Sequence, residues 1–185
     1  MQLSDYACYT LFNRYEIYAV IKTENKRGIT MNYEIVYLEE KKAAGLKIRT
    51  NNDSPDMGAE IGGLWKRFFE EGIFFQMPGK VNDKSIGLYT NYAGDHKDDY
   101  DMFVCCEIDK AAQIPESLAT TVIPKGNYAK FIVKGNMVTA VQEFWMKLWS
   151  MDLKRTYVAD FEEYQPGGDM DNAEIHMYIG IENAD

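Results

Sequence analysis

The sequence predicts an α+β fold made by tandem duplication of a strand–helix–strand–strand unit. Two segments, near residues 61–71 and 138–153, carry apolar and aromatic residues at three- and four-residue spacing, as helices that pack on a sheet do. Each is followed by two short segments of strand-forming residues, in the same order in both halves. We therefore expect a two-fold pseudosymmetric antiparallel sheet with a helix from each unit and a central ligand cleft.

The first thirty residues differ in pattern from the rest of the chain. Five aromatic residues occur within the first 18 without a regular period, and a polar run follows. We expect residues 1–31 to be an N-terminal extension, either a short hairpin or helix that docks on the domain, or a stretch upstream of a true start at Met31. The second alternative arises because codons for Lys26-Arg27-Gly28 can resemble a bacterial ribosome-binding site. Residues 32–182 then form the duplicated domain.

The first unit covers about residues 32–109. Residues 33–50 are strand-like, with Gly45 marking a bulge or a close backbone approach, and NNDSPD is a turn that starts a helix. Gly72 ends this helix, and SIGLYTNY and YDMFVCCEI are two strands of a hairpin. The apolar stripe of the helix consists of Ile61, Leu64, Trp65, Phe68 and Phe69.

The second unit, about residues 110–182, repeats these elements. IPKGNYAKFIVKGN is a strand, residues 138–153 are a helix, and RTYVADFEEY and AEIHMYIGI are strands joined by a Gly-rich turn. When the halves are aligned, KKAAGLKIRTN matches GNYAKFIVKGN, and Trp65 matches Trp145. The same alignment places Glu162 opposite Thr90, so the second unit alone has a carboxylate at this position.

Glu162 lies on the predicted strand over residues 155–164. Period-two alternation puts Asp160, Glu162 and Tyr164 on one face and Phe161 and Glu163 on the other. A carboxylate beside aromatic rings can hold a flat organic cation, because the ring faces attract the cation and the charge acts more strongly away from water. The alternative is that Glu162 is a solvated charge on a half-exposed sheet.

Composition excludes several classes of function. The 185 residues suffice for one domain or two small joined units, and the net charge of −9 argues against direct nucleic-acid binding. No apolar run is long enough to span a bilayer, and the N-terminus lacks a signal-peptide pattern, so we expect a cytoplasmic protein without a membrane partner.

The cysteines, the histidines and the lack of cofactor motifs argue against a metal site or a bound cofactor. Cys105 and Cys106 are adjacent on a strand and face opposite sides, and Cys8 is distant, so three reduced thiols are expected. His96 and His176 have no metal-binding context, and the common nucleotide and hydrolase motifs are missing. We therefore expect neither metal nor cofactor.

These segments together resemble the GyrI-like superfamily, the effector-binding domain of AraC- and MerR-type transcription activators. The likeness is strongest to its stand-alone, integron-associated branch. It spans about residues 32–181. The segments that carry it are AAGLKIRTNN, IGGLWKRFFEEGI, GLYTNYAGD, IPKGNYAKFIVKG, FWMKLW, and DFEEY with AEIHMYIGI.

The resemblance implies an aromatic cleft that receives hydrophobic, often cationic, drug-like molecules. The acidic residue at the family's cleft floor corresponds to Glu162 in the Glu-x-Tyr motif. The aromatic positions around it correspond to Trp65, Tyr89, Trp145, Tyr164 and Tyr178. The tryptophans at helical spacing are also compatible with plain core packing. No DNA-binding segment is recognisable, so transcription regulation in cis is in doubt.

Three functions compete at this point. The first is a small-molecule binding module that acts as a sensor or sequestering protein. The second is a hydrolase of strained or electrophilic genotoxic compounds, with Glu162 as its acid–base group. The third is a gyrase-inhibitor-like module that binds a protein partner through the acidic run at residues 95–101.

Overall fold

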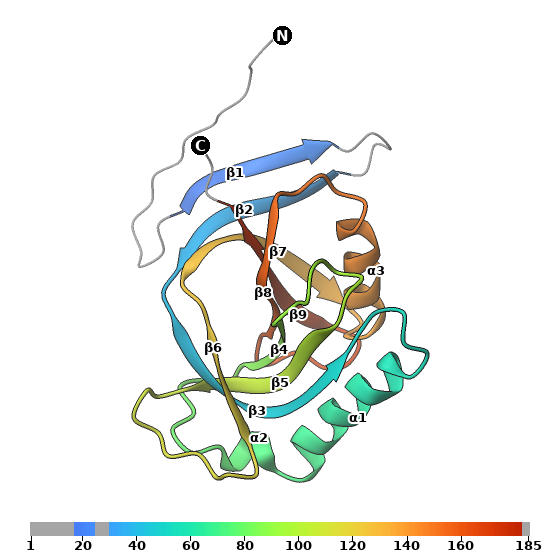
Figure 1. The fold of residues 1–185 in the computed structure, drawn as a ribbon. Helices are drawn as coiled ribbons and strands as arrows, with labels where there is room; N and C mark the ends of the chain where they lie inside the picture. The colour runs from blue at the N-terminus through green and yellow to red at the C-terminus, as the bar shows by residue number, and fades with distance from the viewer. Residues whose placement is uncertain (1–16, 25–29, 183–185) are drawn as a thin grey trace.

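The computed structural model describes residues 17–24 and 30–182, which form nine strands and three helices (Figure 1). The first unit contains β2 (Thr30–Leu38), β3 (Lys41–Thr50), α1 (Met57–Glu70), α2 (Ile73–Gln76), β4 (Ser85–Thr90) and β5 (Tyr100–Ile108). The second contains β6 (Ala119–Ile123), β7 (Gly126–Gly135), α3 (Thr139–Leu148), β8 (Arg155–Tyr164) and β9 (Ala173–Ile181). Ahead of both lies β1 (Ile17–Glu24), which pairs antiparallel with β2; Cys8 lies outside the described residues.

One antiparallel sheet joins both units, in the order β1-β2-β7-β9-β8-β4-β5-β3-β6. Its centre is the β8–β4 pair, and β9 and β7 on one side mirror β5 and β3 on the other. The duplicated, pseudosymmetric α+β fold is therefore confirmed. The first strand of each unit is exchanged, since β2 pairs with β7 of the second unit and β6 pairs with β3 of the first.

The exchange explains two differences from the predicted elements. Residues 33–50 form two strands instead of one, because the chain breaks at Glu39 and Glu40 where it crosses from one half of the sheet to the other. Strand β6 was not predicted. The helix expected over residues 138–153 ends at Leu148, and residues 149–154 lead into β8.

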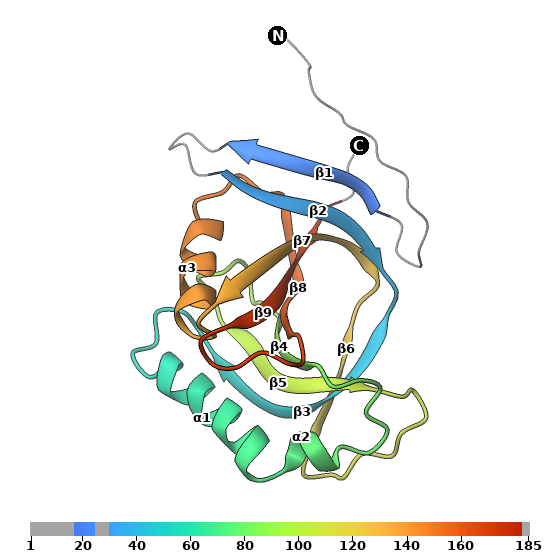
Figure 2. The ribbon, with the colours of Figure 1, turned by 180° about the vertical axis from the view of Figure 1, so that it is seen from behind.

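Three apolar clusters form the core. One lies inside the curve of the sheet and contains residues from strands only, such as Phe161 and Cys105. The other two lie between the sheet and the helices, one under α1 and one under α3. Figures 1 and 2 show both helices on the same, outer side of the curved sheet. Cys105 and Cys106 are buried in different clusters, on opposite faces as expected.

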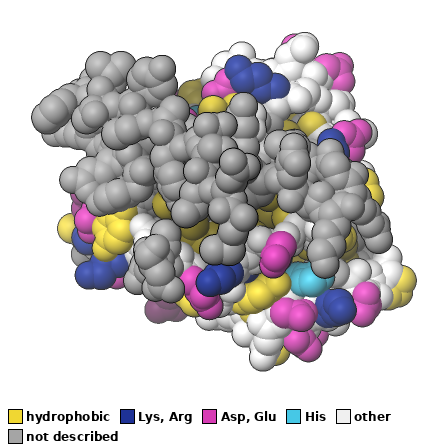
Figure 3. Space-filling view, turned by 90° about the horizontal axis from the view of Figure 1, so that it is seen from above, with side chains coloured by type: hydrophobic (Ala, Val, Ile, Leu, Met, Phe, Trp, Pro, Cys, Tyr) yellow, Lys and Arg dark blue, Asp and Glu magenta, His cyan; other side chains and the backbone are white. Residues whose placement is uncertain are grey.

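No helix within the described part of the chain is long and apolar enough to cross a membrane. On the described part of the face seen from above, acidic and basic side chains are interspersed between hydrophobic ones (Figure 3).

The pairing registers define which residues of the two halves correspond. Leu46 pairs with Val104, and its counterpart Phe131 pairs with Met177, so β3 and β7 align as predicted. Further along, Val104 pairs with Gly87 and Met177 pairs with Glu162.

The counterpart of Glu162 is therefore Gly87, which corrects the expected match with Thr90. By the same register Tyr89 corresponds to Tyr164. The predicted match of Thr90 with Glu162 was therefore shifted by three residues, and the turns that follow β4 and β8 also differ in length.

Candidate functional site

A cleft of about 940 Å³ opens between α1 and α3 above the centre of the sheet. The helices supply its walls, with Trp65 and Phe69 from α1 and Trp145 from α3, while β4 and β8 supply its floor. Most of the lining is apolar, as in sites that bury drug-sized molecules. The residues that fill the floor are Ser85, Tyr89, Glu162 and Tyr164.

The pseudo-twofold axis passes through the pair formed by Gly87 and Glu162. These two residues are counterparts in the duplicated units, and they also pair directly between β4 and β8. Gly87 leaves the room that the carboxylate occupies. A Cβ at Gly87 would lie 3.1 Å from Glu162 Oε2 and 3.2 Å from Trp65 Cζ2. The axis thus has space for one large side chain, which comes from the second unit.

Glu162 is held by three neutral donors. Its Oε1 accepts hydrogen bonds from the Tyr89 hydroxyl at 2.8 Å and the Trp145 indole Nε1 at 2.7 Å. Its Oε2 accepts one from the Tyr164 hydroxyl at 2.7 Å. The residue is 1% exposed, which rules out the alternative that it is a solvated charge on a half-exposed sheet.

The carboxylate of Glu162 has no positively charged partner in the part of the chain that the structure describes. No Lys, Arg or His lies within ion-pair distance of Glu162 in the described residues. Burial raises its pKa, and the bonds from Trp145, Tyr164 and Tyr89 act in the opposite direction without cancelling the effect. Burial and the nearby carboxylate raise the pKa values of Tyr89 and Tyr164 well above the ordinary value, so both remain neutral donors.

Two aromatic pairs reproduce the pseudosymmetry around Glu162. Tyr89 packs edge-on against Trp145 with ring centroids 5.0 Å apart, and Tyr164 packs edge-on against Trp65 at 4.9 Å. The two tryptophans therefore occupy matching places on the inner faces of α1 and α3, as predicted. They differ in one respect: the Trp145 N–H bonds Glu162, while the Trp65 N–H has no hydrogen bond to the described residues.

Five of the six predicted site residues thus meet in one cleft, and Tyr178 does not. Tyr178 pairs with Phe161 on β8 and stacks on its ring at 4.5 Å, on the face opposite Glu162. It is 8% exposed and belongs to the cluster inside the curved sheet. Its assignment to the cleft is therefore corrected. Both faces of β9 are buried, so alternation of polar and apolar residues could not reveal which side Tyr178 faces.

The cleft also contains residues that the sequence did not single out. Arg155, Tyr92 and His96 line one end of it. His96 stacks on Trp149 at 5.8 Å and connects the β4–β5 turn to the end of α3. Four methionines also line the cleft, and flexible thioethers can adapt to ligands of different outline. These are Met57, Met137, Met146 and Met170. Within the described ranges no group of His, Cys, Asp or Glu is arranged to hold a metal ion.

Several solved structures have the same fold as this chain. An integron cassette protein from the mobile metagenome of Vibrio cholerae is 28% identical, with a TM-score of 0.60 over 80% of this chain and 95% of that chain. The protein SAV2435, solved bound to tetraphenylphosphonium, is 21% identical, with a TM-score of 0.65 over 80% and 94% of the two chains.

A putative transcription regulation protein from Staphylococcus aureus is 20% identical, with a TM-score of 0.59 over 81% of this chain and 99% of that chain. Among curated protein sequences, none matches significantly. The family model for integron-associated effector-binding proteins matches residues 34–181, which include both units and the whole cleft. The chain belongs to the family of integron-associated effector-binding proteins.

Proposed function

We propose that this protein binds hydrophobic cations in the cleft, as a sensor or sequestering module, and that Glu162 supplies the attracting charge. The observation that carries the proposal is the buried carboxylate of Glu162, which has three neutral donors and, among the described residues, no ion-pair partner. Such a group favours any ligand that brings a delocalised positive charge into the cleft, because the charges then compensate one another away from water.

The aromatic walls favour the same class of ligand. Trp65, Trp145 and the two floor tyrosines present ring faces and edges to the cleft, and cations are attracted to such faces. An ammonium ion with a tight hydration shell would lose more on entering than a bulky organic cation does. The complex of SAV2435 with tetraphenylphosphonium, a bulky organic cation, supports this proposal.

Turnover is a second candidate function, favoured by one observation. Burial raises the pKa of Glu162, and two hydroxyls lie within 2.8 Å of its oxygens. A carboxyl of raised pKa beside such hydroxyls suits general acid–base chemistry on a strained or electrophilic ring. The described residues show no second ionised group in contact with Glu162, so binding without turnover is the better supported function.

The test uses two ions of the same outline and opposite charge. Tetraphenylphosphonium and tetraphenylborate should each be titrated into the protein while the tryptophan fluorescence is recorded, since Trp65 and Trp145 line the cleft. We expect saturable binding of the phosphonium and binding of the borate at least tenfold weaker. Equal affinities would refute the role of the charge. Mass spectrometry of electrophilic small molecules after incubation would reveal products if the protein is a hydrolase.

A further inference from the structure

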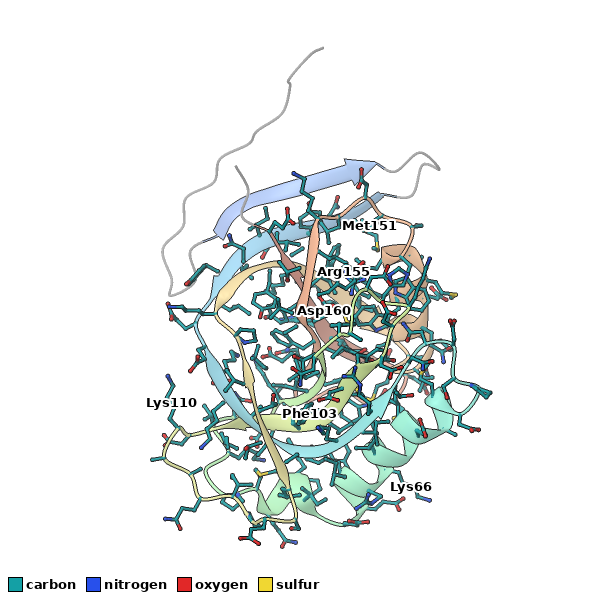
Figure 4. The ribbon with its side chains drawn as sticks, viewed as in Figure 1. Lys66, Phe103, Lys110, Met151, Arg155 and Asp160 are labelled. Atoms are coloured by element: carbon teal, nitrogen blue, oxygen red, sulfur yellow. The ribbon has the colours of Figure 1, made fainter. Side chains whose placement is uncertain are left out.

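A second polar group lies at one end of the cleft. Arg155 lines the cleft, although its side chain is 5% exposed. Its Nη2 donates to Asp160 Oδ2 at 2.6 Å, and its Nε has no partner in the described part of the chain. Figure 4 labels both side chains, which lie next to each other in the middle of the molecule.

A bulge in β8 brings this guanidinium to the cleft. In a regular strand, residues five apart face opposite sides and lie about 16 Å apart. Between Arg155 and Asp160 the register with β9 shifts, and Tyr157 has a φ of 53° in the left-handed region. Gly180 accommodates the bulge, since a Cβ there would lie 2.7 Å from the Ala159 carbonyl oxygen. Such irregularities concentrate at functional sites, where they re-aim a side chain.

The charge of Arg155 is already balanced, but its donors are not all used. Asp160 is fully buried and accepts from Arg155, from the Tyr92 hydroxyl at 2.9 Å and from the Gly180 N–H at 2.9 Å. A guanidinium carries five N–H donors. The bond to Asp160 is the only one that the guanidinium makes within the described residues, and its flat face rests on the Tyr157 ring at 4.4 Å.

We propose that Arg155 is a second recognition group of the cleft, which donates a hydrogen bond to an uncharged carbonyl oxygen of the ligand. A ligand carboxylate fits less well, because Asp160 already neutralises the guanidinium and a further negative charge would lie near two buried carboxylates. Asp160 and Glu162 are two residues apart on one face, about 7 Å along the strand. The favoured ligand is thus an organic cation with a carbonyl oxygen at roughly that distance from its charge.

This inference rests on the proposed binding of cations. A matched pair of probes allows the role of Arg155 and the binding of cations to be tested separately. The ion (4-benzoylbenzyl)trimethylammonium carries a carbonyl between its rings, and (4-benzylbenzyl)trimethylammonium carries a methylene there. Both have the same charge and nearly the same outline. Their dissociation constants should be measured on the full chain by tryptophan fluorescence and calorimetry. We expect the carbonyl probe to bind on the order of tenfold more tightly, the size of one hydrogen bond to a charged donor.

Two variants test whether the preference for the carbonyl probe comes from Arg155. Arg155→Met combined with Asp160→Asn removes both charges together, so neither is left buried alone, and should bring the affinity ratio close to one. Glu162→Gln should weaken both probes by a similar factor and retain the ratio. A ratio near one in the unaltered protein would overturn the role of Arg155, and so would a ratio that the double variant retains. If neither probe binds, the proposed binding of cations fails as well. A ratio near one in the unaltered protein overturns the proposal even if the double variant does not fold.

Discussion

Replacing Glu162 with glutamine removes one negative charge from the cleft with little change of shape. The amide can keep the three hydrogen bonds, because its oxygen accepts from Tyr89 and Trp145 while its nitrogen donates to the Tyr164 hydroxyl. The two aromatic pairs around it do not depend on the charge. A change in affinity therefore reports on electrostatics and not on a rearranged cleft.

The expected magnitude follows from the surroundings of the carboxylate. Two opposite charges about 4 Å apart attract each other by about 4 kcal/mol at an effective dielectric constant near 20, which sets an upper limit. Desolvation and the three neutral donors reduce this value, so we expect a loss of about 1–3 kcal/mol, or roughly 5- to 150-fold in affinity for tetraphenylphosphonium. Binding of neutral molecules should change little, since stacking and apolar burial remain.

The assay is fluorescence titration of Glu162→Gln together with a control variant that has the same net charge. Alternation along β8 would favour Glu163→Gln as the control, but Glu163 is buried and bonds Lys84 at 2.8 Å, so its loss would disturb the fold. Glu143→Gln is better matched, because that side chain is 62% exposed on α3 and does not line the cleft. Equal losses in the Glu143 and Glu162 variants, or an equal loss for neutral ligands, would refute the role assigned to Glu162.

Two further predictions concern pH and the N-terminal residues. Burial raises the pKa of Glu162, so the free energy of unfolding of the empty protein should fall, relative to that of Glu162→Gln, as the pH rises through the raised pKa. The affinity for cations should increase over the same pH range. Urea titrations at several pH values measure the stability, and a difference between the two proteins that does not change with pH would contradict the prediction. A chain that starts at Met31 should unfold cooperatively, since the described side chains from Met31 onward already form three core clusters. Loss of a single calorimetric transition would show that the first thirty residues belong to the fold.

The sequence predicted the duplicated fold because each helix repeats one aromatic pattern, with Trp65 and Trp145 at matching positions. It also predicted the face of β8 that carries Glu162 and Tyr164, where the strand is regular. It could not predict that Arg155 lines the cleft, because alternation assumes a regular strand and the bulge after Arg155 breaks that assumption. Tyr178 was misplaced for a related reason, since a strand buried on both faces shows no polar alternation.

Replacing Gly87 tests why only one of the two units places a charged side chain at the pseudo-twofold axis. A Cβ at this position would lie 3.1 to 3.3 Å from Glu162, Trp65 and Met102 at once, so Gly87→Ala requires these neighbours to shift by a few tenths of an ångström. We expect a loss of about 1 kcal/mol in the free energy of unfolding, the scale of mild overpacking.

The pattern of affinity losses separates this variant from the charge variant. Because Gly87→Ala displaces the floor of the cleft without removing its charge, it should weaken tetraphenylphosphonium and neutral aromatic molecules alike, whereas Glu162→Gln should weaken the cation alone. Fluorescence titration of both variants with both classes of ligand measures this difference. Unchanged affinities in Gly87→Ala would mean that the floor tolerates a second side chain. In that case, the missing side chain at Gly87 would not be the reason why Glu162 can occupy the pseudo-twofold axis.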